Sequence, residues 1–228
     1  MKKFKLLIIS ILSVVLIFST VYTNNLKAYA SYDEFIPFCF DNTVPNYDNI
    51  RSAIYPQVFS ITPIEIWDLF IQEGVKIYVT SSAPRFNTNG GAINGKTYGA
   101  SVIFNPSSKK IQSVNAPVEI YISNNANVDT YLHECGHALD FIAEYITGYY
   151  KGNCTISASS KWKSLYSKYA SVMARFDIPA ANNMYDATEG FAEAYRLYLT
   201  YPQDLKTYCP EVFTFVANQI TKPELFTA

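Results

Sequence analysis

The chain has 228 residues, of which 49% are hydrophobic and 16% charged, and its formal net charge is −1. This balance is typical of a folded globular protein and excludes a disordered or fibrous chain. Basic residues do not cluster beyond the N-terminal leader, so we expect neither a nucleic acid nor an anionic membrane surface as partner.

The N-terminus has the pattern of a secretory signal peptide. A positive head of Lys2, Lys3 and Lys5 precedes an almost unbroken apolar run at 6–22, and Ala28-Tyr29-Ala30 is a small-residue cleavage site. We therefore predict cleavage after Ala30, export to the extracellular space and no stable membrane association afterwards. An uncleaved membrane anchor is the alternative, because an apolar run of this length approaches that of a bilayer-spanning helix.

Residues 31–228 then form the mature chain, which has the length of one domain. Cleavage removes four lysines and no acidic residue, so 14 basic and 19 acidic residues remain and the net charge becomes −5. Export permits disulfides, and a Cys154–Cys209 bridge is one candidate, while Cys39 has no assigned partner. Cys135 is expected to be a small packing residue. We expect the protein to be a monomer.

The first predicted helix covers 63–73. Thr62 is a capping residue, Pro63 suits the first helical position, and Gly74 is a helix-ending residue. Residues 75–80 follow with alternating β-branched side chains, which predicts a strand.

The segment 81–117 is expected to consist mainly of turns and loops. Four of the nine glycines fall at 90–99, and only 101–104 has the character of a short strand. Apolar and polar side chains alternate again over 117–123, which predicts a further strand.

From residue 127 onward, apolar residues recur at spacings of three and four, which is the period of a helix. This periodicity predicts helices over 128–147, 160–175, 187–199 and 210–220. Because strands come first and helices follow, without regular alternation, we predict an α+β fold.

The stretch 133–137 reads His-Glu-Cys-Gly-His. Residues four apart share one helix face, so His133 and His137 can direct both imidazoles at one Zn²⁺ ion. Glu134 is placed to polarise a water molecule and move protons rather than to bind the metal. The alternative is coincidence on an amphipathic helix, but the chain has only two histidines and both lie in this motif.

The third ligand is expected from another helix. The long form of the motif found in metzincins requires Gly at 140 and His or Asp at 143, where this chain has Asp140 and Ala143. Glu144 lies about 10 Å farther along the same helix and cannot share the metal.

Glu189 and Glu193 are four apart on the predicted helix 187–199 and share a face. We interpret Glu189 as the metal ligand and Glu193 as an acid that accepts a hydrogen bond from a liganding histidine. The alternative for Glu189 is a capping box with Asp186 on the protein surface.

The segments 133–140 and 189–197 together resemble the catalytic domain of anthrax lethal factor and the clostridial Pro-Pro endopeptidases, which are secreted single-domain enzymes. The likeness covers 50–228, and its specific part is confined to these two segments. It implies a secreted zinc metalloendopeptidase of the gluzincin type, with Glu189 as the zinc-binding glutamate and Glu193 as the supporting acid.

The same family places a tyrosine seven residues before that glutamate to stabilise the oxyanion. Here that position is Asn182, and the nearest tyrosine is Tyr185, four residues before Glu189. We take Tyr185 as the candidate oxyanion donor; the alternative is that it only packs against its neighbours.

These features predict a zincin-like fold, with a small twisted sheet over the motif helix and a mainly helical C-terminal lobe. A protein or peptide substrate would pair with an edge strand, for which 117–123 is the candidate. We expect one Zn²⁺ per chain and hydrolysis of peptide bonds in extracellular proteins by metal-activated water, with Glu134 as general base and Pro-Pro specificity as one option. The alternatives are a zinc hydrolase of non-peptide bonds and a catalytically degenerate secreted binding or toxin-accessory protein.

Overall fold

The computed structural model describes residues 38–40, 53–80, 87–88, 91–92, 94–152 and 155–221. These residues belong to one compact unit that begins at Pro37. The predicted signal peptide and Cys154 lie outside the described residues, so the leader and the domain start at residue 31 stay predictions. Over the ranges that are described, helices long and apolar enough to cross a bilayer are absent.

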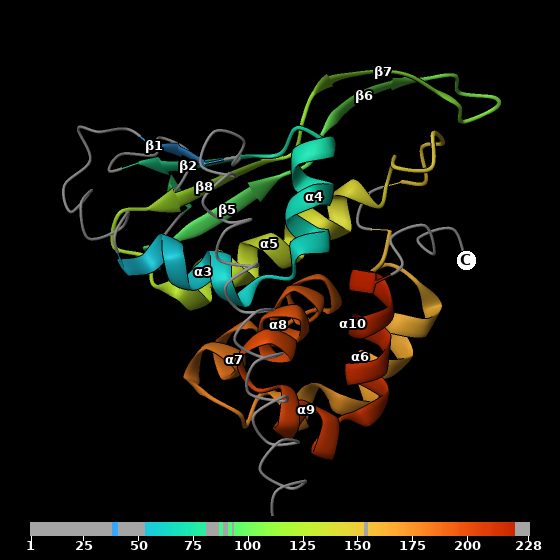
Figure 1. The fold of residues 1–228 in the computed structure, drawn as a ribbon. Coiled ribbons are helices and arrows are strands. Elements are labelled where there is room, and N and C mark those ends of the chain that lie inside the picture. The colour runs from blue at the N-terminus through green and yellow to red at the C-terminus, as the bar shows by residue number, and fades with distance from the viewer. Residues whose placement is uncertain are drawn as a thin grey trace, which may run out of the picture. The chain divides into compact units, whose positions relative to one another are not determined.

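A four-stranded mixed sheet forms one layer of this unit (Figure 1). Its strands, in spatial order, are β1 (Phe38–Phe40), β2 (Lys76–Thr80), β8 (Glu119–Ser123) and β5 (Gly95–Tyr98). The first three are parallel, and β5 pairs antiparallel with β8. The strand predicted over 117–123 is present as β8, but its predicted place at the sheet edge is wrong: β8 is paired on both sides and, among the described strands, β5 forms that edge.

The sheet buries one face. Along β8, Ile120 and Ile122 are buried while the residues between them are half-buried, and Ile77 and Val79 repeat the pattern on β2. Helix α5 (Val128–Ile142) packs against β8 and β5 on this side. The alternation that predicted both strands therefore marks the face that covers the motif helix.

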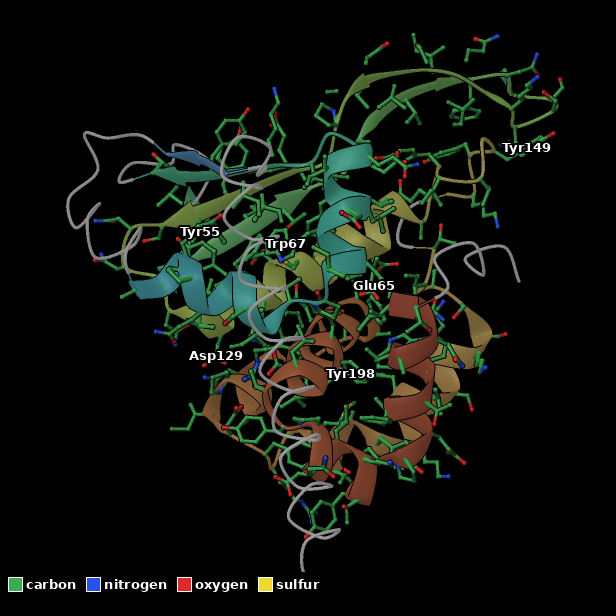
Figure 2. All side chains as sticks on the ribbon, viewed as in Figure 1. Tyr55, Glu65, Trp67, Asp129, Tyr149 and Tyr198 are labelled. Atoms are coloured by element: carbon green, nitrogen blue, oxygen red, sulfur yellow. The ribbon has the colours of Figure 1, made fainter. Side chains whose placement is uncertain are left out.

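The region 81–117 contains more strand than predicted. Besides β5, the pair β3 (Asn87–Thr88) and β4 (Gly91–Ala92) forms a small hairpin, and β6 (Ser101–Phe104) pairs with β7 (Ile111–Ala116) in a second one. Strand β7 is exposed at four consecutive positions, so it lacks the one-sided burial that creates an apolar alternation. The second hairpin is tied to the rest of the unit by a β-bridge between the main chains of Lys110 and Tyr149. Figure 2 shows Tyr149 close to this hairpin.

Helices make up most of the remaining structure. Their bounds are α3 (Tyr55–Ile61), α4 (Ile64–Gln72), α5 (Val128–Ile142), α6 (Ser160–Met173), α7 (Ile178–Asn183), α8 (Ala187–Thr200), α9 (Pro202–Tyr208) and α10 (Pro210–Thr221). The long predicted helices are confirmed, except that 143–147 form turns rather than the end of α5. Helices α3, α7 and α9 were not predicted, because six or seven residues are too few to show a helical period.

The C-terminal helices enclose an aromatic core. The ring of Trp162 on α6 lies 5.5 Å from that of Phe191 on α8 and 5.5 Å from that of Phe215 on α10, measured between centroids. Cys209, between α9 and α10, is a fully buried free thiol, so the considered Cys154–Cys209 bridge is not formed. Cys135 is likewise free and buried on α5, as expected for a packing residue. A mixed sheet and a helical lobe confirm the α+β class.

Candidate metal centre

Helix α5 presents both histidines to one point. Its N-terminus is capped by the Asn127 side chain, which accepts a hydrogen bond from the Thr130 amide. One turn separates His133 from His137, and their ring centroids lie 4.8 Å apart at an interplanar angle of 81°. Both imidazoles are largely buried, so their orientation is set by packing as well as by helix spacing.

Helix α8 brings in the carboxylates. Asp186 caps this helix by accepting hydrogen bonds from the amides of Thr188 and Glu189. Asp186 therefore has the capping role that was considered as an alternative. The cap uses the main-chain amide of Glu189, so the Glu189 carboxylate can still face α5. The two helices cross closely because Gly136 has no side chain: a Cβ atom there would lie 2.7 Å from the Ala192 Cα atom.

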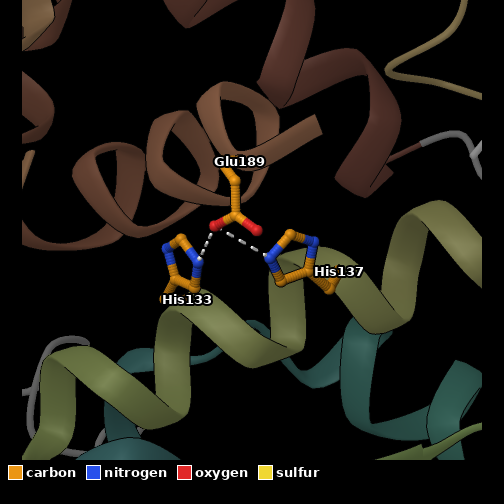
Figure 3. Close-up of side chains that lie close together, drawn as sticks. All are labelled: His133, His137 and Glu189. Carbon is orange, nitrogen blue, oxygen red and sulfur yellow. Dashed lines mark hydrogen bonds and ion pairs between the residues drawn. The ribbon is translucent and has the colours of Figure 1, made fainter. Parts of the chain in front are cut away.

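His133, His137 and Glu189 converge (Figure 3). Oε2 of Glu189 lies 3.1 Å from Nε2 of His133 and 3.4 Å from Nε2 of His137. All three possible donor atoms fall within 4.8 Å of one another. Glu144, which was excluded by its distance along the helix, does not belong to this group. Among the described residues, His133, His137 and Glu189 form the single group of histidine, cysteine and acidic side chains that could hold a metal ion.

Glu193 contacts the other nitrogen of His133. Its Oε2 lies 3.0 Å from His133 Nδ1, and its Oε1 accepts hydrogen bonds from the Arg196 guanidinium, at 2.8 Å from Nε. Arg196 also binds Asp129 at the start of α5 and Asp177 at the start of α7. Sequence reasoning missed this arginine. The spacing Glu193-x-x-Arg196 was a signal for a local pair, but nothing local indicated Asp129 or Asp177.

These contacts shift the acid–base properties of the group. Burial lowers the pKa of His133, but hydrogen bonds to Glu189 and Glu193 outweigh it and raise the pKa to about 10. Burial would raise the pKa of Glu189, yet hydrogen bonds to His133 and His137 hold it well below its ordinary value. Burial likewise acts against the lowered pKa of Glu193, which results from hydrogen bonds to His133 and Arg196.

Glu134 points toward the sheet rather than toward Glu189. Its carboxylate Oε2 accepts a hydrogen bond of 2.6 Å from the Thr97 hydroxyl on β5. Gly95, on the same face of β5, lies so close that a Cβ atom there would be 2.7 Å from both Cγ and Oε1 of Glu134. The predicted base is thus held between α5 and the edge strand, and only 6% of its surface is exposed. Sequence reasoning missed Thr97 as well, because no local pattern points to it.

A cavity of about 750 Å³ opens onto this group. Its walls include His133, Glu134, His137, Glu189, Asn182 and Tyr185. The Tyr185 residue is 69% exposed, so it is not a core packing residue. Burial of its hydroxyl, followed by the nearby Glu189 carboxylate, raises the pKa of Tyr185, which keeps the phenol protonated. Both Asn182 and Tyr185 therefore have access to the same space as the metal-binding candidates.

The sequence matches no protein-family model, and a comparison with curated proteins found no match. The structure is similar to that of the PRO-PRO endopeptidase PPEP-2 from Paenibacillus alvei, with a TM-score of 0.50 and 20% sequence identity. The match covers 81% of this chain and 97% of that one. At this identity the likeness shows the fold alone, and it agrees with the predicted arrangement of a small sheet and a mainly helical C-terminal lobe. The resemblance to lethal factor stays a prediction.

Proposed function

We propose that this chain is a secreted, zinc-dependent endopeptidase of the gluzincin type. The observation that carries the proposal is the convergence of two imidazole nitrogens and one carboxylate oxygen from α5 and α8, with Glu134 one residue from the first histidine. The PPEP-2 likeness supports it, since a protein of the same fold is an endopeptidase.

The chemistry of the donor set, two imidazoles and one carboxylate, fits zinc. Two ligands that are each 2.0–2.1 Å from a tetrahedral ion lie roughly 3.3 Å apart; the Glu189 oxygen lies 3.1 Å and 3.4 Å from the two histidine nitrogens, and all three atoms lie within 4.8 Å of one another. His133, His137 and Glu189 would hold the ion, and Glu193 would fix the His133 ring through Nδ1. A bound Zn²⁺ would supply Lewis-acid polarisation of the scissile carbonyl and activation of water.

The side chains of the protein then have distinct roles. Glu134 takes a proton from the attacking water and gives it to the leaving amine nitrogen. Oε2 already accepts a hydrogen bond from the Thr97 hydroxyl, and we assign the transferred proton to Oε1, the other oxygen. Tyr185, whose hydroxyl stays protonated, donates a hydrogen bond to the oxygen on which negative charge develops.

The edge strand defines where a peptide substrate binds. Among the described strands, β5 pairs on one side only, with β8, and it borders the cavity through Gly95, Lys96 and Thr97. We propose that an extended segment of an extracellular protein adds to the open side of β5 and crosses the cavity beside Glu134. Pro-Pro bonds are one class of substrate to be tested, because that specificity appears in the name of PPEP-2.

The test combines metal analysis with cleavage of a peptide library that includes Pro-Pro sequences. We expect about one zinc per chain and cleavage within peptides, with Glu134→Gln keeping the zinc but losing nearly all turnover, since the variant removes the base and no ligand. Absence of zinc together with full activity of His133→Ala would refute the proposal. Hydrolysis confined to esters or other non-peptide bonds would favour the alternative hydrolase, and zinc binding without any hydrolysis would favour a binding protein.

A further inference from the structure

The catalytic carboxylate of the proposed enzyme is contacted from outside its own helix by the edge strand β5. Residues Gly95 and Thr97 are two apart on this strand and therefore lie on the same face, which is turned toward α5. Glu134 is the residue of α5 that both of them reach. The contact joins residues 37 positions apart in sequence, so it depends on the tertiary structure alone.

The Thr97 hydroxyl makes the stronger half of this contact. It has one proton to donate and two acceptors within reach, the Glu134 carboxylate Oε2 at 2.6 Å and the Glu134 main-chain oxygen at 3.1 Å. A separation of 2.5–2.7 Å is typical of a hydroxyl that donates to an ionised carboxylate. The hydroxyl therefore holds Oε2, while the bond to the main chain is the weaker option.

Gly95 restricts the other carboxylate oxygen. A Cβ atom on Gly95 would lie 2.7 Å from Oε1 and 2.7 Å from Cγ of Glu134, so the Glu134 carboxylate fills the space that a side chain at Gly95 would need and lies close against the strand. Oε2 is thus bound and Oε1 is confined, in a side chain that is 6% exposed. A carboxylate held in this way has little rotational freedom.

We propose that Thr97 is a positioning residue, which aims the Glu134 carboxylate at the substrate bound along β5. This role rests on the proposed function, because the direction of Glu134 matters for turnover only if Glu134 is the base. One strand would then supply both the edge that pairs with the peptide and the hydroxyl that orients the base. The distance and direction between the bound peptide and the Glu134 carboxylate would therefore be fixed by β5. A misplacement of about 1 Å in such a site can lower the rate by roughly 100-fold.

Two matched pairs of side chains isolate the hydroxyl. Threonine and valine have nearly the same shape and differ in a hydroxyl against a methyl group, and serine and alanine differ only by the presence of the hydroxyl. In zinc-loaded protein we expect Thr97→Val to lower kcat by roughly 10- to 100-fold with KM and zinc content unchanged. Thr97→Ser should restore most of the lost kcat and Thr97→Ala should not. If Thr97→Val does not fold, the serine and alanine variants make the same comparison.

The matched control is Thr214→Val on α10, where the threonine hydroxyl is exposed and donates to the Pro210 carbonyl of its own helix. This variant should retain the parent kcat. A Thr97→Val variant with the parent kcat, or a Thr97→Ser variant as slow as Thr97→Val, would show that Thr97 does not position the base. Crystal structures of the parent and of Thr97→Val test the same point without activity. If the parent cleaves no peptide, the proposed function fails, and an unchanged Glu134 conformation in Thr97→Val would separately refute the positioning role.

Discussion

Glu189 and Glu193 show how two identical side chains on one helix face obtain different tasks. Each contacts His133, but Glu189 lies at Nε2 and shares its oxygen with His137, whereas Glu193 lies at Nδ1 and is bound by Arg196. In the proposed metal site, Glu189 is therefore one of the three candidate donors, and Glu193 would fix the tautomer and orientation of His133.

We expect Glu189→Ala to lose most of its bound zinc, because it removes one of the three donors. Glu193→Ala should retain a complete donor set and lose about 10- to 100-fold in zinc affinity or activity. Competition with a chelator, monitored for both variants beside the parent, measures the affinities. Loss of zinc from Glu193→Ala with retention in Glu189→Ala would mean that the two roles are reversed.

Tyr185 can be tested by removing its hydroxyl alone. Tyr185→Phe should bind zinc and substrate like the parent but lower kcat by roughly 100-fold, the scale on which one oxyanion donor acts. Its place on the cavity wall next to Glu189 is the reason. Steady-state kinetics that give an unchanged kcat would assign the role elsewhere and leave Asn182, another residue on the cavity wall, as the next side chain to replace.

The stability of the metal-free protein should depend on pH through the same cluster. The pKa of His133 is about 10 in the folded protein and about 6.5 in the unfolded chain, so protonation of His133 stabilises the fold. This stabilisation is fully present below pH 6.5 and is lost as the pH rises toward 10. The lowered pKa values of Glu189 and Glu193 stabilise above about 4.3 and lose this effect as pH falls. Thermal unfolding with a chelator present should therefore show the largest stabilisation by this cluster between about pH 4.3 and 6.5. The unfolding temperature of His133→Gln should not show the decline above pH 6.5 that the parent shows. If the unfolding temperatures of the two proteins change with pH in parallel, the raised pKa of His133 is contradicted.

Among the helices, Arg196 connects α5, α7 and α8. Its guanidinium is 1% exposed and contacts Asp129 in the first turn of α5, Asp177 at the cap of α7 and Glu193 on its own helix. The two acids outside α8 are 67 and 19 residues away in the sequence. One buried side chain thus holds three helix segments around the metal-binding candidates.

Replacement of this arginine should destabilise the fold. Arg196→Met leaves three carboxylates without their shared cation, and loss of one partner from a buried ion pair costs about 3–5 kcal/mol. Lys168→Met is the matched control, because the Lys168–Glu211 pair is exposed and should contribute little. Urea unfolding of the two variants and the parent measures the difference. Equal midpoints for both variants would show that the Arg196 contacts do not support the fold.

Across the whole molecule, the candidate site draws on both layers of the fold. Helix α5 packs under the sheet and α8 belongs to the helical lobe (Figure 1). The cavity is lined by residues of α5, α8 and the edge strand β5. A substrate in that cavity would contact both layers at once. To meet the proposed extracellular substrate, the protein would have to be exported, which depends on the predicted leader.

Export can be checked directly. Expressed in a secreting bacterial host, the full chain should release a mature protein into the medium whose first residue is Ser31. N-terminal sequencing of the released protein identifies the cleavage site. Ala30→Arg, which replaces a small residue of the site, should reduce release; a chain that keeps residues 1–30 and stays in the membrane fraction would favour an anchor instead.

The local parts of this site can be predicted from the amino-acid sequence. A helical period and a four-residue spacing are properties of a short segment, so they are sufficient to assign His133, His137, Glu189 and Glu193 to shared helix faces. Asp186 as a helix cap is local in the same sense.

Which segments meet depends on the packing of the whole chain. Apolar alternation shows that 119–123 is a strand with one buried face, but not that β5 pairs beside it and takes the edge. The same holds for Thr97 on Glu134 and for Asp177 on Arg196, which are contacts between segments distant in the sequence. Each polar side chain has many acceptable partners, and the tertiary structure selects among them, because hydrogen bonds depend on position and direction in space rather than on sequence spacing.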